Sequence, residues 1–355
     1  MVAVGEARKE PEHSACGGFW SSLAIDSKIS RVSYLGPSPQ NVDVYIAGTW
    51  DEPTNKLSVW QVYYGKGGLP ADQYFKISNE IAVSSSVNSI FCENQHVIAG
   101  LEDGAIEVCV VEGENILKRI QSLPKAHGKF ASSTAVCIVD GEIVSGSDSG
   151  TIIKIDLSSM PVKPNVLATD LSSVKRMAVL GRHEFVSAHG SGQLHLWDNR
   201  VAGFPVFSKA VSSLADSINA IDSHPAQPNV IAYGTNSGSI AFVDVRQYKQ
   251  PTSNLLKVSE SPITDLGFHP KFPKNCFVMS EEGLLHLDLS ASKAEKIDDV
   301  NTRQNTWLAA ASWNLIDINQ LEGPKKPSCF DISPRSLLCG SNTNYLDLLT
   351  AAQFY

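Results

Sequence analysis

The sequence has few cysteines and none of the spacings that hold zinc or carry out thiol exchange. Seven cysteines are scattered through 355 residues, and no two of them form a C-x-x-C pair. An odd number of widely separated cysteines does not make a disulfide framework. We therefore expect reduced, structural thiols of the kind found in cytosolic or nuclear proteins.

Long hydrophobic runs are also missing. The longest apolar stretch, TWLAAASWNLIDI at 306–318, is shorter than the ~20 residues that a membrane-spanning helix needs. The segment 1–18, MVAVGEARKEPEHSACGG, carries charges of both signs and no apolar core, so it does not resemble a signal peptide. We predict a flexible tail over 1–18 and no insertion into a membrane.

Positive charge is in deficit. The chain has 29 Lys and Arg against 37 Asp and Glu, a formal net charge of −8, with an isoelectric point near 5.6. Proteins that bind phosphate backbones usually show a basic excess or a basic stripe. The short basic spots, KPNVLATD and GPKKP, are typical of solvated loops, and we expect no direct binding to nucleic acid.

A turn followed by a short apolar strand recurs along the chain. The turn residue is a glycine in five copies, Gly104, Gly150, Gly192, Gly238 and Gly283, at steps of 46, 42, 46 and 45 residues. Two further copies carry Asn55 and Asn344 at this place, and asparagine also tolerates the positive φ that such turns need. The sequence therefore contains seven copies of one unit.

The residues after each turn alternate between the two sides of a strand. The second residue after the turn is aliphatic in every copy: Leu57, Ile106, Ile152, Leu194, Ile240, Leu285 and Leu346. Two apolar runs precede each turn and a variable segment follows it, so one unit can supply four strands. About 45 residues per four-stranded unit is the period of a β-propeller blade. We predict an all-β, seven-bladed β-propeller.

The ring of blades needs a closing strand. The seventh copy supplies three strands, while FWSSLAI at 19–25 has the composition of a strand and precedes the first copy. We predict that 19–25 is the outer strand of the seventh blade, and that 19–355 forms a single domain. By the same reasoning, NLIDINQL at 314–321 is predicted as the outer strand of the sixth blade.

Some of these units resemble WD40 repeats. GSGQLHLWDNR at 190–200 ends its strand with Trp197 and Asp198, and the fifth copy ends with Asp244. The predicted structural residues of the blades are Asn55, Gly104, Gly150, Gly192, Trp197, Asp198, Gly238, Asp244, Gly283 and Asn344. The other copies lack the Trp-Asp pair, so the resemblance rests on the series rather than on each repeat.

The second half of the chain has a recognisable order of features. It runs from GQLHLWDNR through HPAQPNVIAYGTNSGSIAFVDVRQ and HPKFPKNCFVMSEEGLLHLD to SLLCGSNTNYLDLL. This order resembles that of one WD40 family, the forty-three-kilodalton nucleoporins of the Y-shaped, outer-ring complex of the nuclear pore. The resemblance implies a non-enzymatic scaffold subunit that supports pore assembly and nucleocytoplasmic transport. It also implies a location in the nucleus, at the pores of the nuclear envelope, and at kinetochores in some dividing cells.

The same resemblance implies the partners. They would be other nucleoporins of the Y-shaped complex, including a helical scaffold nucleoporin of its short arm, and we expect no homo-oligomer. A WD40 adaptor of another assembly, such as a histone-binding or ubiquitin-ligase receptor subunit, is the alternative. A propeller hydrolase or metal-dependent enzyme is a third, which would need His, Asp and Glu gathered at the channel.

Several segments resemble catalytic or ligand-binding motifs, but each lacks a required residue or spacing. A phosphate-binding G-x-G-x-x-G loop at 190 would need glycine at position 195, where His195 stands, and a helix after it. His183 and His189 in HEFVSAH are spaced two residues too far apart for the zinc motif H-E-x-x-H. His224-Pro225 and His269-Pro270 are typical of turns. We predict no catalytic, metal-binding or cofactor-binding residues and no cofactor.

One insertion is rich in aromatic residues. Tyr63, Tyr64, Tyr74 and Phe75 lie within 61–80, between the third strand of the first unit and the second unit. Aromatic side chains are enriched at the centres of protein interfaces. They also cover the edges of their own sheets, and the sequence leaves both possibilities open: a partner contact, or packing within the first blade.

Overall fold

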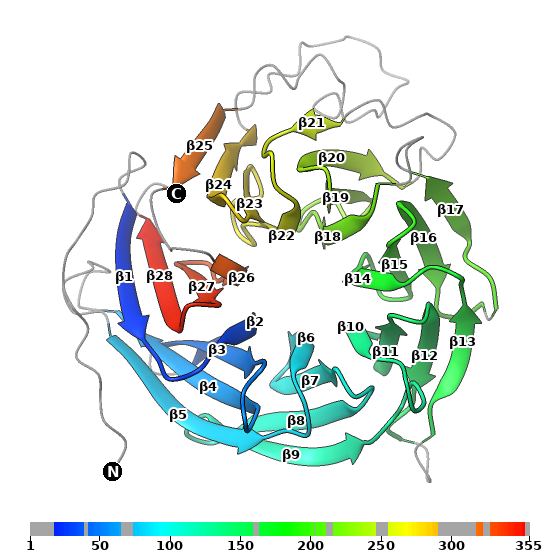
Figure 1. Cartoon of the computed structure of the whole chain (residues 1–355), viewed down its shortest axis with the longest axis horizontal. Helices are drawn as coiled ribbons and strands as arrows, with labels where there is room; N and C mark the ends of the chain where they lie inside the picture. Colours follow the sequence, from blue (N-terminus) through cyan, green and yellow to red (C-terminus); the bar gives the residue numbers. More distant parts are fainter. Residues whose placement is uncertain are drawn as a thin grey trace.

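The strands form a ring of seven sheets around a central channel (Figure 1). The computed structural model describes residues 18–38, 42–64, 74–158, 163–201, 203–210, 216–245, 255–289, 317–321 and 327–351. Each sheet has four antiparallel strands, so the predicted all-β, seven-bladed propeller is confirmed. No helix in these ranges is long and apolar enough to cross a membrane. Residues 1–17 of the predicted tail lie outside the described residues.

Each blade runs from the channel outward in chain order. Blade 1 contains β2 (Ile29–Ser38), β3 (Val42–Thr49), β4 (Lys56–Tyr63) and β5 (Tyr74–Ala82). Blade 2 contains β6 (Val87–Glu93), β7 (His96–Leu101), β8 (Ile106–Glu112) and β9 (Ile116–Leu123). Blade 3 contains β10 (Ser133–Val139), β11 (Glu142–Ser147), β12 (Thr151–Ile155) and β13 (Asn165–Thr169). Blade 4 contains β14 (Val174–Val179), β15 (Glu184–His189), β16 (Gln193–Asp198) and β17 (Phe207–Ala210).

The remaining blades follow the same order. Blade 5 contains β18 (Ile218–Ser223), β19 (Val230–Thr235), β20 (Ser239–Asp244) and β21 (Leu256–Lys257). Blade 6 contains β22 (Ile263–Phe268), β23 (Asn275–Ser280), β24 (Gly283–Asp288) and β25 (Asp317–Leu321). Blade 7 contains β26 (Pro327–Ile332), β27 (Leu337–Ser341), β28 (Tyr345–Ala351) and, from the start of the chain, β1 (Gly18–Ala24).

The N-terminal strand closes the ring, as predicted. β1 pairs antiparallel with β28 from Gly18 opposite Ala351 to Ala24 opposite Tyr345. In Figure 1 the blue β1 lies beside the red β28, at the outer edge of blade 7. Trp20 is buried among side chains of blades 6 and 7. The observed strand begins one residue earlier than the predicted segment.

The outer strand of blade 6 is also confirmed where the structure describes it. β25 pairs with β24 over its whole length, from Asp317 opposite Asp288 to Leu321 opposite Leu284. The earlier part of the predicted segment and both tryptophans before it lie outside the described residues.

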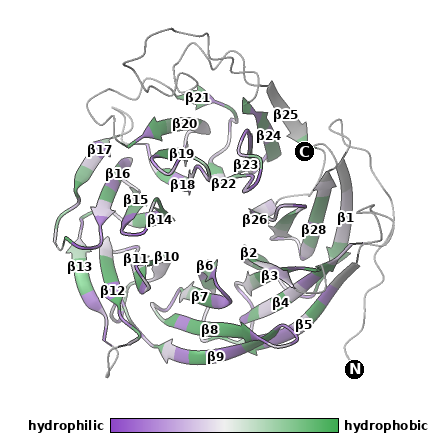
Figure 2. Ribbon diagram, turned by 180° about the vertical axis from the view of Figure 1, so that it is seen from behind, coloured by the Kyte–Doolittle hydropathy of each residue, from purple (hydrophilic) through white to green (hydrophobic). Residues whose placement is uncertain are grey.

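The hydrophobic core lies between the blades. The second strands are buried on both faces, and β3 and β19 are buried at every residue. Figure 2 shows hydrophobic stretches along β8, β20, β24 and β28, with hydrophilic residues at many turns. Each blade packs between two neighbouring blades, so both faces of its sheet are buried. The alternation of apolar residues in the sequence therefore identifies only one of the two buried faces. One cluster, for example, joins Ile46 and Val59 of blade 1 to Val97 of blade 2.

Four of the five repeated glycines adopt the left-handed backbone that the turn requires. Gly104, Gly150, Gly192 and Gly238 have φ between 78° and 83°, and Asn344 has φ of 65°. Gly283 differs, with φ of 133°, and is the first residue of β24. The turns are also tightly packed, because a Cβ atom at Gly238 would lie 2.1 Å from the carbonyl oxygen of Ser259. A glycine is required there for conformation and for space.

The positive φ expected at Asn55 is wrong. The turn between β3 and β4 is longer than the others, and its left-handed residue is Asp51, with φ of 52°. Asn55 instead acts through its side chain, whose Oδ1 accepts a hydrogen bond of 3.2 Å from the Thr49 hydroxyl. In this longer turn the left-handed residue lies near the start of the turn. Asn55, which aligns with the turn glycines of the other blades, therefore does not adopt their conformation.

Candidate functional site

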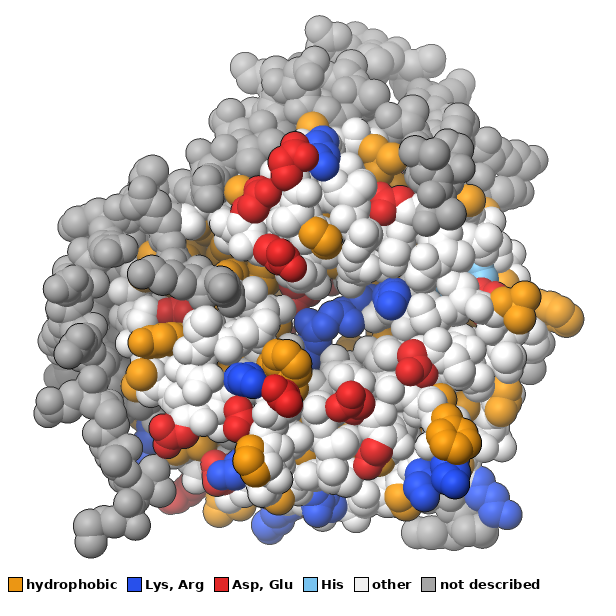
Figure 3. Space-filling view, viewed as in Figure 1, with side chains coloured by type: hydrophobic (Ala, Val, Ile, Leu, Met, Phe, Trp, Pro, Cys, Tyr) orange, Lys and Arg blue, Asp and Glu red, His pale blue; other side chains and the backbone are white. Residues whose placement is uncertain are grey.

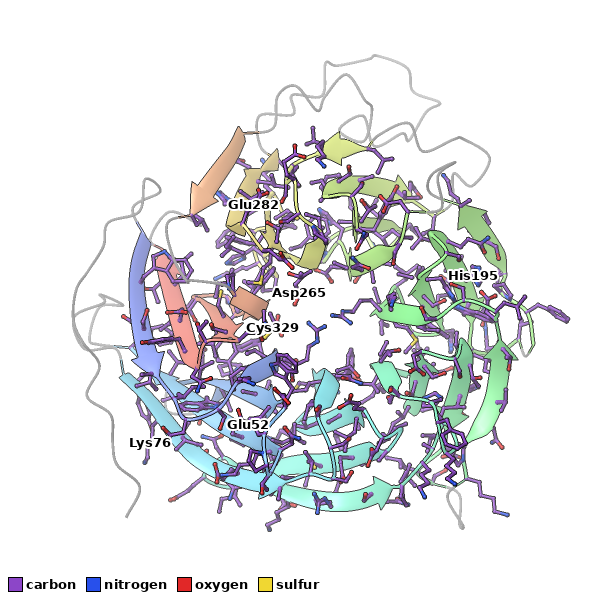
Figure 4. The ribbon with its side chains drawn as sticks, viewed as in Figure 1. Glu52, Lys76, His195, Asp265, Glu282 and Cys329 are labelled. Atoms are coloured by element: carbon purple, nitrogen blue, oxygen red, sulfur yellow. The ribbon has the colours of Figure 1, made fainter. Side chains whose placement is uncertain are left out.

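The channel is lined by the innermost strands of the blades. Its cavity of about 370 Å³ is bordered by two arginines, Arg31 and Arg176, and three aspartates, Asp222, Asp265 and Asp331. Figure 3 shows basic side chains within the central opening of one face. Figure 4 places Asp265 at the channel wall. The channel is therefore a candidate functional site.

The channel aspartates bind the backbone of the neighbouring blade. Asp222 Oδ2 of blade 5 accepts a hydrogen bond of 2.8 Å from the Phe268 N–H of blade 6. Asp331 Oδ2 of blade 7 accepts one of 2.7 Å from the Tyr34 N–H of blade 1. Each also accepts a hydrogen bond from the residue that follows it. These carboxylates therefore hold consecutive blades together.

Burial raises the pKa of the same carboxyl groups. Burial raises the pKa of Asp222 to about 7 and that of Asp331 to about 6. It also raises the pKa of Asp265, although Arg31, 3.5 Å away, opposes the shift. Asp222 is therefore partly protonated near neutral pH.

The cysteine of the described channel lining is not an activated nucleophile. This cysteine is Cys92, and burial raises the pKa of its thiol to about 12, so it stays protonated. No histidine borders the described channel wall. The raised pKa of the aspartates follows from their structural position between blades, and their oxygens are committed to backbone N–H groups.

A second polar cluster joins blade 7 to blade 1. Asp43, which is 1% exposed, accepts hydrogen bonds from the Tyr64 hydroxyl, the Ser333 hydroxyl and the Arg335 guanidinium, at 2.7, 2.7 and 2.8 Å. The Arg335 guanidinium also lies over the Tyr64 ring, 4.5 Å from its centre. These hydrogen bonds compensate the burial of the Asp43 carboxylate and connect blade 7 to blade 1.

The predicted partner contacts divide into two groups. Tyr64 is used inside the protein, as its contacts with Asp43 and Arg335 show, which supports packing within the fold for that residue. The Tyr63 hydroxyl donates to Gln61 Oε1 at 2.6 Å, at the end of β4. Tyr74 and Phe75 begin β5, and their side chains lie outside the described residues.

The histidines at the predicted turns have the expected structural role. His224 Nδ1 accepts the Ala226 N–H, and His269 Nδ1 accepts the N–H groups of Lys271 and Phe272. In blade 7 the equivalent position is taken by a serine hydroxyl with the same function. These side chains satisfy the backbone of the turn between the first and second strands.

Trp197 and Asp198 both make hydrogen bonds within blade 4. The Trp197 indole N–H donates to the Ser187 hydroxyl at 2.8 Å, and that hydroxyl contacts His189 Nε2 at 2.8 Å. Asp198 ends β16 and binds Arg200 through both of its oxygens. Burial lowers the pKa of His189, so its imidazole is neutral in this network.

The structure separates the three histidines that the sequence grouped. His183 pairs with Asp140, on the side of blade 4 away from the turn. His189 and His195 stack with ring centres 4.3 Å apart and share Asp170 as a neighbour. Sequence reasoning missed Asp170, since it lies in the loop before blade 4 and belongs to no recognisable motif.

Exposed apolar side chains lie in one loop of blade 4. Val201, Phe204 and Val206, in the loop between β16 and β17, are 50%, 80% and 59% exposed. Figure 3 shows hydrophobic side chains projecting at the right-hand edge of the ring, where Figure 1 places β16 and β17. Large exposed apolar groups that gather in one loop are typical of protein contacts.

Comparison with known proteins gives the same family resemblance as the sequence motifs. No protein-family model matches the chain. Nucleoporin Nup43 of Mus musculus is 26% identical to it over 319 residues, and nucleoporin Nup43 of Homo sapiens is 27% identical over 319 residues. Each alignment covers 83% of this chain and 83% of the relative. The predicted resemblance to WD40-type nucleoporins is confirmed.

Proposed function

We propose that this chain is a non-enzymatic scaffold subunit of the nuclear pore, in the Y-shaped complex of its outer ring. The observation that carries the proposal is similarity to two nucleoporins over 83% of both chains, together with seven complete blades. The protein would support pore assembly and nucleocytoplasmic transport from the nuclear envelope. The kinetochore location has no support from the relatives and is not part of the proposal.

Docking would use the rim of the ring rather than its channel. The channel aspartates are occupied by inter-blade hydrogen bonds, while Val201, Phe204 and Val206 point an apolar loop at solvent. A helical nucleoporin would cover this loop with an apolar helix face. The partner class comes from the resemblance, and the loop is the surface that the structure offers for it.

One observation favours the alternative of an adaptor for acidic peptides. Arg31 and Arg176 border the channel cavity, and such a pair suits carboxylate or phosphate groups. Arg31 is partly used, because its Nε donates to the Asn88 carbonyl oxygen at 2.9 Å. We therefore rank the scaffold role above the adaptor role.

The test is a fluorescent tag on the endogenous protein combined with its purification. The scaffold role predicts a signal at the nuclear rim and stoichiometric recovery of the other Y-complex nucleoporins. Phe204→Ser should reduce that recovery at least about tenfold with the protein still folded, since removal of an aromatic anchor typically costs 2 kcal/mol or more. A diffuse signal with no nucleoporin recovered would overturn the proposal, and recovery of histones or ligase subunits would support the adaptor.

A further inference from the structure

Blade 4 carries a group of titratable side chains that the proposed function does not use. It consists of Asp170, His189 and His195, and we call it the blade-4 triad. Asp170 Oδ2 lies 3.3 Å from His189 Nδ1 and 3.7 Å from His195 Nδ1, and the three ligand atoms lie within 4.8 Å of one another. Figure 4 places His195 on the outer part of the ring, well away from the channel where Asp265 lies.

The fold brings the three residues together from two blades. His195 on β16 is paired directly with Ser187 on β15, and His189 follows Ser187 by two residues, so both imidazoles project from one face of blade 4. Asp170 comes from the loop between β13 and β14. Its own N–H donates to the Gly150 carbonyl oxygen at 2.9 Å, which fixes that loop against blade 3.

Two atoms of the triad have no hydrogen-bond partner although they are buried. His195 is 7% exposed, and its Nε2 lies 2.9 Å from Gln193 Oε1, so Nε2 carries the proton and Nδ1 presents a lone pair. His195 Nδ1 and Asp170 Oδ2 both lack a hydrogen-bond partner and lie 3.7 Å apart. Two electron-pair donors at this distance repel unless a positive charge lies between them.

A proton is a poor candidate for that charge. His195 Nδ1 and Asp170 Oδ2 lie 3.7 Å apart, which is too far for a hydrogen bond made by a proton on either atom. A metal ion satisfies both atoms without protonating the ring. Neutral imidazole nitrogens and a carboxylate oxygen are ligands that divalent transition metals accept.

We propose that the blade-4 triad binds one divalent transition-metal ion, with Zn²⁺ as the ion to test, through His189 Nδ1, His195 Nδ1 and Asp170 Oδ2. A tetrahedral Zn²⁺ ion with ligands at about 2.0–2.2 Å separates its ligand atoms by about 3.3–3.6 Å. The distance from Asp170 Oδ2 to His189 Nδ1, 3.3 Å, lies within this range, and the distance to His195 Nδ1, 3.7 Å, exceeds it by about 0.1 Å. Three protein ligands leave the fourth position to a water or another ligand.

The surroundings can orient His189 for this role. In the hydrogen-bonded arrangement its Nδ1 lies 3.3 Å from the Ser172 carbonyl oxygen and Nε2 contacts Ser187. When Nδ1 binds the ion, the ring proton moves to Nε2, which then donates to the Ser187 hydroxyl while that hydroxyl still accepts from Trp197. Partners of this kind set the tautomer of metal-bound histidines. The ion would connect the loop between β13 and β14, which carries Asp170, to strands β15 and β16 of blade 4.

The first experiment measures Zn²⁺ binding to the metal-free full-length protein by calorimetry. We expect one equivalent to bind, and Asp170→Asn and His195→Gln to weaken it at least about tenfold each. Asp170→Asn retains Oδ1, which accepts the Leu171 N–H, so the loop keeps its main hydrogen bonds. His183→Gln is the matched control, because His183 is a histidine of the same blade that pairs with Asp140. This variant should bind Zn²⁺ with the affinity of the parent protein.

A second measurement separates binding at the triad from binding to thiols. Co²⁺ should give visible absorption typical of nitrogen and oxygen ligands, without the charge-transfer bands of thiolates, and Asp170→Asn should abolish it. Saturating Zn²⁺ should raise the melting temperature of the parent protein and of His183→Gln, but not of Asp170→Asn. Circular dichroism of the metal-free variants checks their folding.

Three results would overturn the proposal: no binding of either ion, binding that survives both triad variants, or a thiolate spectrum. In the first case the triad is a hydrogen-bonded network only, and His195→Gln would change stability equally with and without metal.

Discussion

Asp331 Oδ2 accepts a hydrogen bond of 2.7 Å from the backbone N–H of Tyr34, and this contact ties the last blade to the first from the channel side. On the outer side, β1 completes the sheet of blade 7. The ring is therefore closed twice, once by a side chain and once by a strand. Closure matters because each blade depends on its neighbours to cover both faces.

Asp331→Ala removes the channel-side closure. The N–H groups of Tyr34 and Ile332 would each lose their acceptor, and an unsatisfied buried N–H costs about 1–3 kcal/mol. We expect the free energy of unfolding in urea to fall by about that amount. Glu114→Ala is the control, since Glu114 is exposed, and equal stability of the two variants would contradict the role assigned to Asp331.

Removal of residues 1–26 deletes the outer closure. The edge of β28 would lose its partner strand and the buried Trp20 would be absent from its cluster. We expect the melting temperature to fall by at least about 5 °C. Removal of 1–17 alone, which stops before β1, should have little effect. Equal melting temperatures for both truncations would show that the strand is dispensable.

Arg335→Ala leaves the Asp43 carboxylate buried without its cation. Removal of one partner of a buried ion pair costs about 3–5 kcal/mol, and the cost here should be nearer 2 kcal/mol, since 28% of the Arg335 side chain reaches solvent. Chemical denaturation measures the change. Lys118→Ala, in an exposed pair with Glu112, should produce little change, and a similar result at both positions would argue against the buried network.

The raised pKa of Asp222 gives stability an unusual pH dependence. Because the folded pKa, about 7, lies above the ordinary 3.8, the folded state holds a proton that the unfolded state has released. The resulting stabilisation is complete below about pH 4 and is lost as the pH rises through about 7. Asp222→Asn removes this titration, so its stability should rise relative to that of the parent protein between pH 5 and pH 8.

Thermal melts of both proteins across this range measure the difference. Comparison within one pair is needed because buried histidines act in the opposite direction: burial lowers the pKa of His269 to about 4, and the stability that its neutral form contributes is lost on acidification from 6.5 to 4. Glu114→Gln should follow the parent protein at every pH. A constant difference for Asp222→Asn would show that this carboxyl group is ionised throughout.

The sequence by itself determined the blade count, the strand order and the closing strand. Strand alternation and left-handed turns are local properties of the backbone, so they repeat visibly wherever the unit repeats. Leu194 and Gly192 could be assigned to their strand and turn without knowing what lay beside them. Asn55 was an exception, since a longer turn changed its conformation.

Only the tertiary structure decided which polar side chains meet. Asp222 with Phe268, Asp43 with Arg335, and Asp170 with His195 each join different blades or opposite ends of the chain. No local period encodes such pairs, because they depend on how far each blade turns relative to the next and on the path of each loop. The scaffold could therefore be predicted from the sequence, while the joints between blades and the blade-4 triad could not.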